Sequence, residues 1–176
     1  MAKGLVIVFT GDGKGKSSAA LGIALRAFGH NMSVSVIQFI KGPLLTGEAK
    51  AAERLRPPIR FISLGRGFVT GHEDEIPFSE HQRAAEEALT LARQIMASGP
   101  LDILILDEIN NAVQLGLVDI RDVLDLVRNK PAALHLILTG RDAHPDLIAA
   151  ADLVTEMRAV KHPFDSGMPS QKGIDY

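Results

Sequence analysis

A glycine-rich segment between an apolar run and an amphipathic stretch constrains the fold of this chain most. Leu5–Phe9 is continuously apolar, as in a strand buried on both faces, and Ser17–Phe28 has apolar residues at helical spacing up to Gly29. Between them lies Gly11-Asp12-Gly13-Lys14-Gly15-Lys16-Ser17. In that setting a glycine-rich turn can wrap its N–H groups around a phosphate at a helix N-terminus. The segment predicts a phosphate-binding loop, in a variant form with Thr10 where the usual pattern begins with glycine.

Charged and hydroxyl side chains within this loop have separate expected roles. The Lys16 ammonium would neutralise phosphate oxygens, and the Ser17 hydroxyl would bind Mg²⁺, or Mn²⁺ as an alternative, because these cations favour oxygen ligands. An ordinary strand-to-helix turn is the competing interpretation, but strand, Gly-Lys-Ser and helix together favour phosphate binding. The expected ATP-binding residues of the loop are Gly11, Asp12, Gly13, Lys14, Gly15, Lys16, Ser17 and Ser18.

Short apolar runs alternate with helix-like stretches along the rest of the chain. That alternation is typical of parallel sheets built through right-handed crossovers. At 176 residues and 46% hydrophobic composition, the chain suits one domain with a sizeable core. We therefore expect a single α/β domain over residues 1–176, with a largely parallel sheet covered by helices in the three-layer, RecA-like P-loop NTPase fold. The further strands are expected at Val34–Ile40, Ile59–Leu64, Leu101–Leu106 and Leu134–Thr139.

Three more segments have a recognisable character: one helix and two irregular stretches. Ser79–Ser98 has one apolar face and predicts a scaffold helix, with a capping box formed by Ser79 and Gln82 and a stop at Gly99-Pro100. Residues 65–77 and the tail 158–176 lack periodicity. Irregular segments of that length in a compact domain are often functional, so we expect a second ligand there.

Two carboxylates end the Leu101–Leu106 strand, in the sequence Leu-Asp107-Glu108. Because ligands of such sheets bind at the carboxyl edge, Asp107 and Glu108 are candidate Mg²⁺ ligands together with Ser17. Lys41 and Arg141 also follow predicted strands and are candidate phosphate-binding cations. Lys16 and Glu108 are the expected catalytic residues.

Composition excludes several classes of protein. The formal net charge is −2, and no concentrated basic segment is present, which argues against a nucleic-acid partner. The chain has no cysteine, and no segment has the length of a membrane span or the form of a cleaved signal, so a cytoplasmic location is expected. The six histidines are not at metal-ligand spacing.

The chain resembles the P-loop class of ATP:corrinoid adenosyltransferases over almost its whole length. The resemblance rests on the variant loop, on short motifs after the strands and on the tail. These motifs are Thr10–Ser18, Gln38–Gly42, Gly65–Phe68, Leu106–Glu108, Thr139–Arg141, Glu156–Arg158, Val160–Gly167 and Gln171–Tyr176.

This resemblance implies a reaction. ATP would be the cosubstrate, and the Co(I) of a reduced corrinoid would attack the ribose 5′ carbon and expel triphosphate, in cobalamin biosynthesis or salvage. The nucleotide would lie in the loop in the reverse of the usual P-loop orientation. A homodimer and an electron-donating flavoprotein partner would also be expected.

The resemblance also implies where the corrinoid would lie. Phe68 matches the first member of an aromatic pair that covers one face of the corrinoid, whereas Thr70 stands where tryptophan is usual. Phe78 or Phe164 could supply the missing apolar wall. Lys161 and His162 of the tail are the other expected corrinoid contacts. Some relatives have an N-terminal segment over the site, and here residues 65–77, the tail or a partner subunit would replace it.

Two other functions fit parts of the pattern. A P-loop ATPase switch would use Glu108 to polarise a water molecule and would release ADP and phosphate. A non-catalytic corrinoid carrier regulated by ATP would bind corrinoid without forming a cobalt–carbon bond.

Overall fold

The computed structural model describes residues 3–42, 46–55, 59–67, 69 and 76–175. Six strands form one sheet in the order β3-β2-β4-β5-β1-β6, and every neighbouring pair is parallel. This confirms the expected α/β fold with a parallel sheet covered by helices, the P-loop NTPase architecture. The strands are β1 Val6–Thr10, β2 Val34–Gln38, β3 Arg60–Ser63, β4 Ile103–Asp107, β5 His135–Thr139 and β6 Leu153–Glu156.

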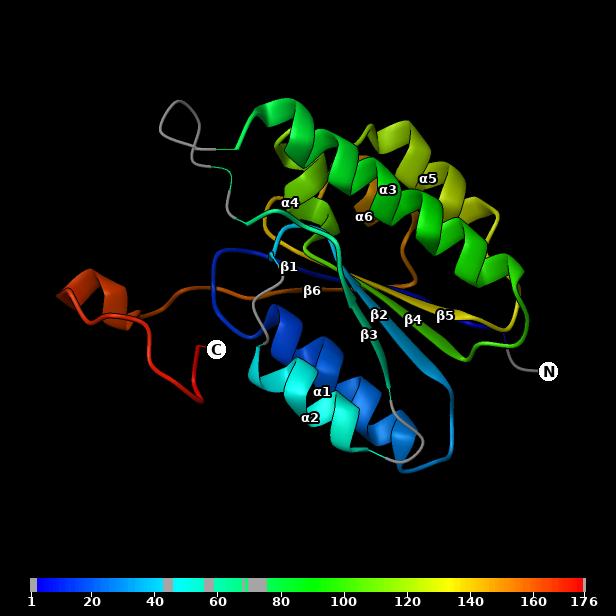
Figure 1. Cartoon of the computed structure of the whole chain (residues 1–176), viewed down its shortest axis with the longest axis horizontal. Coiled ribbons are helices and arrows are strands. Elements are labelled where there is room, and N and C mark those ends of the chain that lie inside the picture. The colour runs from blue at the N-terminus through cyan, green and yellow to red at the C-terminus, as the bar shows by residue number, and fades with distance from the viewer. Residues whose placement is uncertain (1–2, 43–45, 56–58, 68, 70–75, 176) are drawn as a thin grey trace.

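The central strands are buried on both faces, which explains their unbroken apolar sequences. Successive side chains of a strand point to opposite faces, so each strand contributes to two separate cores. Leu104 and Leu106 of β4 join one core with the long helix α3, while Ile103 and Ile105 join the other core with α1. Helices α1 and α2 lie on one side of the sheet, and α3 to α6 lie on the other (Figure 1). Their bounds are α1 Lys16–Phe28, α2 Gly47–Arg54, α3 Phe78–Ala97, α4 Ile109–Gln114, α5 Ile120–Arg128 and α6 Pro145–Ala150.

The start of α3 differs from the sequence prediction. The helix begins at Phe78 with Pro77 as its N-cap residue, and the Pro77 carbonyl accepts a hydrogen bond from the Glu80 N–H at 2.8 Å. Ser79 therefore lies inside the first turn and cannot cap it, so the predicted capping box with Gln82 is wrong. The physical reason is that extended Pro77 already supplies the turn into the helix, one residue before the serine.

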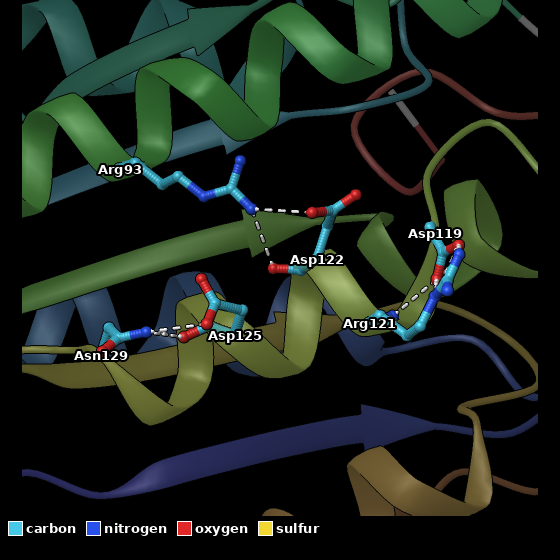
Figure 2. A network of polar contacts seen from close by, with 6 residues as sticks. All are labelled: Arg93, Asp119, Arg121, Asp122, Asp125 and Asn129. Carbon is cyan, nitrogen blue, oxygen red and sulfur yellow. Dashed lines mark hydrogen bonds and ion pairs between the residues drawn. The ribbon is translucent and has the colours of Figure 1, made fainter.

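Polar contacts hold α5 against α3. A guanidinium nitrogen of Arg93 lies 3.3 Å from an Asp122 carboxylate oxygen and 3.2 Å from the Asp122 carbonyl oxygen, as Figure 2 shows. Asp119 caps α5 by accepting a hydrogen bond from the Arg121 N–H at 2.8 Å. The guanidinium of Arg121 beside it also lowers the pKa of the Asp119 carboxyl to about 2. These contacts fix the helix layer opposite α1 and leave the carboxyl edge of the sheet free for a site.

Strand β6 was not predicted from the sequence. Its four residues are exposed, because it lies at the sheet edge beside β1, so it lacks the apolar run that reveals the inner strands. The chain then runs beyond the carboxyl edge of the sheet to a short 3₁₀ helix, Pro163–Ser166, and turns back toward α1 (Figure 1). None of the helices in the described ranges has the length and apolar character that crossing a bilayer requires.

Candidate nucleotide site

The predicted phosphate loop follows β1 and leads directly into α1. Gly15 is the N-cap residue of α1 and has φ 112°, a left-handed conformation that side-chain-bearing residues rarely adopt. The ammonium group of Lys16 donates hydrogen bonds to the carbonyl oxygens of Gly11 at 2.6 Å and Gly13 at 2.8 Å. Burial and the positive charge of Arg141 lower the pKa of Lys16. The loop therefore holds a partly desolvated cation against its own backbone.

The chain after β6 crosses directly over this loop. The Gly13 N–H donates to the Met157 carbonyl oxygen at 2.7 Å, and the Met157 N–H donates to the Thr10 carbonyl oxygen at 2.8 Å. A Cβ atom on Gly13 would lie 2.7 Å from the carbonyl carbon of Arg158, closer than real Cβ atoms come. Gly13 therefore serves the packing of the tail, a role that the sequence pattern alone did not reveal.

A pocket of about 620 Å³ opens beside the loop at the carboxyl edge of the sheet. Its lining combines the start of α1 with residues that follow β2, β4 and β5 and with the end of the tail. Lys14 also forms an ion pair with Asp175 of the tail, which closes one side. The pocket is lined by Lys14, Gly15, Lys16, Ser17, Ser18, Leu21, Lys41, Gly47, Glu48, Glu108, Asn111, Thr139, Gly140, Arg141, Gly173, Ile174 and Asp175.

Strand order explains why these residues meet. Strand β5 lies between β1 and β4, so Thr139 at its end stands between the phosphate loop and the carboxylates after β4. The Thr139 hydroxyl donates to an Asp107 oxygen at 2.7 Å and accepts the Glu108 N–H at 2.9 Å. The other Asp107 oxygen accepts from the Gln38 amide at 3.0 Å. Asp107 is 3% exposed and is not among the residues that line the pocket, and its role in binding Mg²⁺, directly or through water, stays a prediction.

Glu108 is the carboxylate that enters the pocket. Its backbone is left-handed, with φ 65° and ψ 18°, at the start of α4. Burial, followed by the charge of Asp107, raises the pKa of Glu108 to about 7, although Lys41 opposes the shift. One of its carboxylate oxygens, Oε2, is buried without a hydrogen-bond partner among the described residues. Such an oxygen costs free energy unless a cation or donor reaches it.

The residues of the pocket are suited to a divalent cation. Glu108 and Ser17 both line the pocket and supply the hard oxygen ligands that Mg²⁺ favours. In the described ranges no group of three or more His, Asp or Glu side chains is placed to bind a metal unaided. Mg²⁺ in such sites usually keeps water and nucleotide phosphates as its remaining ligands. The residues therefore fit Mg²⁺ that arrives with a nucleotide.

The two cations predicted after strands β2 and β5 both reach the pocket. Lys41 is half-buried and lies 3.5 Å from a Glu48 carboxylate oxygen, so α2 restrains it. Arg141 is exposed, and its backbone N–H donates to the Asn111 side-chain oxygen at 3.1 Å. Lys16 is close enough to Arg141 and Glu108 for both charges to affect its pKa. The charges of Lys41 and Lys16 thus both act on the Glu108 carboxylate, while Arg141 acts on Lys16.

Among the described residues, the other expected site residues are not part of the pocket lining. Gly11 and Gly13 pack against Met157 and Arg158 of the tail, and Asp12 is exposed between them. In the tail, Lys161 is exposed, and the His162 ring caps the 3₁₀ helix by accepting the Phe164 N–H at 3.2 Å. Phe68 and Thr70 fall outside the described residues. Asn111, Thr139 and Asp175 were not predicted as site residues. Thr139 and Asp175 lie within the resemblance motifs Thr139–Arg141 and Gln171–Tyr176, whereas Asn111 belongs to no motif and only the fold brings it here.

Comparison with known proteins identifies the family. A sequence profile described as ATP:corrinoid adenosyltransferase BtuR/CobO/CobP matches residues 2–176. The chain belongs to this family. It is 40% identical over 174 residues to the corrinoid adenosyltransferase of Pseudomonas aeruginosa, covering 99% of this chain and 84% of that protein. It is 37% identical to the corrinoid adenosyltransferase of Escherichia coli K12, covering 99% of this chain and 86% of that protein. These matches confirm the resemblance inferred from the motifs.

The fold of this adenosyltransferase family member also matches a solved structure of low sequence identity. The flagellar accessory protein FlaH from Methanocaldococcus jannaschii superimposes with a TM-score of 0.57 at 13% identity, covering 89% of this chain and 72% of that chain. At that identity the match concerns the fold alone.

Proposed function

We propose that this protein transfers the 5′-deoxyadenosyl group of ATP to the cobalt of a reduced corrinoid. One observation supports this most: four cationic side chains, Lys14, Lys16, Lys41 and Arg141, line one pocket together with Glu108, in a chain that matches the adenosyltransferase profile over residues 2–176. In the reaction, the Co(I) electron pair forms a bond to the ribose 5′ carbon. The carbon–oxygen bond breaks, its electrons leave with triphosphate, and no phosphoryl group moves.

The chain's own residues would act mainly on the leaving group. Triphosphate gathers negative charge as the carbon–oxygen bond lengthens, and fixed cations stabilise developing charge without having to reorganise. Lys16, Lys41 and Arg141 line the pocket and are the residues proposed for this role. Ser17 and Glu108 would hold Mg²⁺, with Asp107 acting on it through water, and the bound cation supplies further positive charge to the phosphate oxygens. Mn²⁺ is the proposed substitute, since it accepts the same oxygen ligands.

The ammonium group of Lys16 already lies within the loop. Its two hydrogen bonds to backbone carbonyl oxygens would be exchanged for stronger charge-assisted bonds to phosphate. Because burial lowers the pKa of Lys16, a bound polyanion would be the more favourable neighbour for its charged form. Lys16 would therefore bind phosphate and stabilise the leaving group with one charge.

The corrinoid would bind next to the nucleotide, so that its cobalt can reach the ribose 5′ carbon. Phe68, Thr70, Lys161 and His162 remain the proposed corrinoid contacts. A homodimer, an electron-donating flavoprotein and a cytoplasmic location are further proposals that rest on the family resemblance and on the cysteine-free composition.

The reaction can be tested with purified protein, ATP, Mg²⁺ and chemically reduced cob(I)alamin under anaerobic conditions. We expect a light-sensitive cobalt–carbon product in the visible spectrum, with one triphosphate released for each product formed. Lys16→Ala should abolish both, whereas Arg128→Ala, which removes an exposed cation of α5 on the other side of the sheet, should not. Release of ADP and phosphate without adenosylated cobalt would instead identify an ATPase. Corrinoid binding with neither product would identify a carrier.

A further inference from the structure

We infer that Gln38 is a positioning residue for the nucleotide-associated cation, acting through a hydrogen-bond chain that crosses four strands of the sheet. The inference rests on the proposed function for its ligand, Mg²⁺ with ATP, and concerns residues that do not touch that ligand. The members of this hydrogen-bond chain are Ser63 at the end of β3, Gln38 at the end of β2, Asp107 at the end of β4 and Thr139 at the end of β5.

The direction of each hydrogen bond in this chain is determined by its neighbours. The Ser63 hydroxyl donates to the Gln38 side-chain oxygen at 2.8 Å, so the Gln38 NH₂ group faces Asp107 and donates at 3.0 Å. On the other side, Thr139 accepts a backbone N–H and must direct its own proton to Asp107. Asp107 therefore accepts from both sides, and its two oxygens have fixed partners.

The hydrogen-bond chain ends at Glu108, the residue that enters the pocket. The N–H that Thr139 accepts belongs to Glu108, whose backbone is left-handed with φ 65° directly after β4. That hydrogen bond fixes the backbone from which the Glu108 side chain starts, and so restricts where its carboxylate can lie. Loss of the Gln38 donor would free one Asp107 oxygen, loosen Thr139 and allow the Glu108 carboxylate to move.

The central members of the hydrogen-bond chain are shielded from bulk water. Gln38 is 1% exposed, Asp107 is 3% exposed and Thr139 is fully buried. Gln38 could instead serve only to join β2 to β4. That alternative can be tested separately, because a second hydrogen bond joins the same two strands at their amino ends. There the Ser33 hydroxyl donates to an Asp102 oxygen at 2.8 Å. Ser33 thus offers a matched control with the same strand pair and no path to the pocket.

The test measures ATP binding by calorimetry as a function of free Mg²⁺, without corrinoid. Partners that orient metal ligands typically change metal affinity about 10–100-fold when they are removed. Gln38→Met, which keeps the length of the side chain and removes its hydrogen bonds, should raise the half-saturating Mg²⁺ concentration by about that factor. Gln38→Glu, which turns an acceptor toward Asp107, should do the same. Ser33→Ala should leave the Mg²⁺ dependence unchanged while lowering the melting temperature.

A double-substitution experiment separates positioning from general damage. Ser63→Ala removes the half-buried end of the hydrogen-bond chain. It should raise the half-saturating Mg²⁺ concentration, but by a smaller factor than Gln38→Met. It should have no further effect in the Gln38→Met background, because Ser63 acts only through Gln38. Independent effects of the two substitutions, or a normal Mg²⁺ dependence in Gln38→Met and Gln38→Glu, would overturn the positioning role. Neither result would bear on adenosyl transfer, whose failure would appear only in the cobalt–carbon assay.

Discussion

Replacing Glu108 with glutamine should make the ligand-free protein more stable and less able to bind its ligand. The reason is the buried carboxylate, whose pKa rises from a usual 4.5 to about 7 through burial and the charge of Asp107. A raised pKa means that the folded state binds the proton more tightly than the unfolded chain does. The free energy of unfolding therefore falls as pH rises from 4.5 to 7, and the whole cost is present above pH 7.

The size of this cost follows from the shift itself. At 1.36 kcal/mol for each pH unit, a rise from 4.5 to about 7 corresponds to about 3 kcal/mol. Glutamine has nearly the same shape and cannot ionise. We expect Glu108→Gln to exceed the wild-type protein in stability by about 3 kcal/mol at pH 8, and by little or nothing at pH 5.

Urea unfolding between pH 5 and pH 8, without nucleotide or Mg²⁺, measures this difference directly. At each pH, the free energy of unfolding of the wild-type protein is subtracted from that of the variant. This cancels the contributions of the other titrating groups, which both proteins share. Glu86→Gln, which removes an exposed carboxylate of α3, is the control variant. A flat difference for Glu108→Gln would refute the reasoning, because it would mean that the Glu108 carboxylate is not destabilised by burial.

Four further outcomes can be checked with simple variants. Lys16→Ala should lower the ATP affinity and the transfer rate about 100-fold or more, because it removes a preorganised positive charge that binds phosphate. The circular dichroism spectrum should stay unchanged, and a normal ATP affinity in calorimetry would contradict this prediction. Gly13→Ala should displace the tail, since its Cβ would lie 2.7 Å from the Arg158 carbonyl carbon, and should speed proteolysis of the tail; unchanged cleavage would argue against that contact. Leu104→Ala should cost about 2–5 kcal/mol in urea unfolding because Leu104 is fully buried, whereas exposed Leu25→Ala should cost about 0.5 kcal/mol or less; equal costs would contradict the core assignment. Chelating Mg²⁺ should weaken ATP binding reversibly in calorimetry; binding unaffected by chelation would remove the proposed cation role.

Local sequence carried most of the information about strands and about the phosphate loop. The β1 run is apolar because both faces of the strand are covered, so its pattern does not depend on which strands lie beside it. The loop glycines and Lys16 are recognisable for a similar reason: a tight turn and a phosphate charge are needed within a few consecutive residues. The same reasoning was less reliable at helix ends, where Pro77 rather than Ser79 begins α3.

The edge of the sheet was harder to predict. Strand β6 is exposed along its four residues and has no apolar run, since an edge strand needs fewer buried contacts. Its role appears only once β6 pairs with β1 and sends Met157 across the loop. The function of Gly13 in that crossing could not be distinguished from phosphate binding by sequence pattern alone.

The sequence by itself determined that a strand, a glycine-rich loop and a helix form a phosphate site, and its motifs determined the family. Only the tertiary structure decided which distant residues share that site. Asp107 and Glu108 are adjacent in the chain, but the sheet register buries the first between Gln38 and Thr139 and turns the second into the pocket. The physical reason is that strand order sets the neighbours of each strand end, and it arises from packing of the whole sheet.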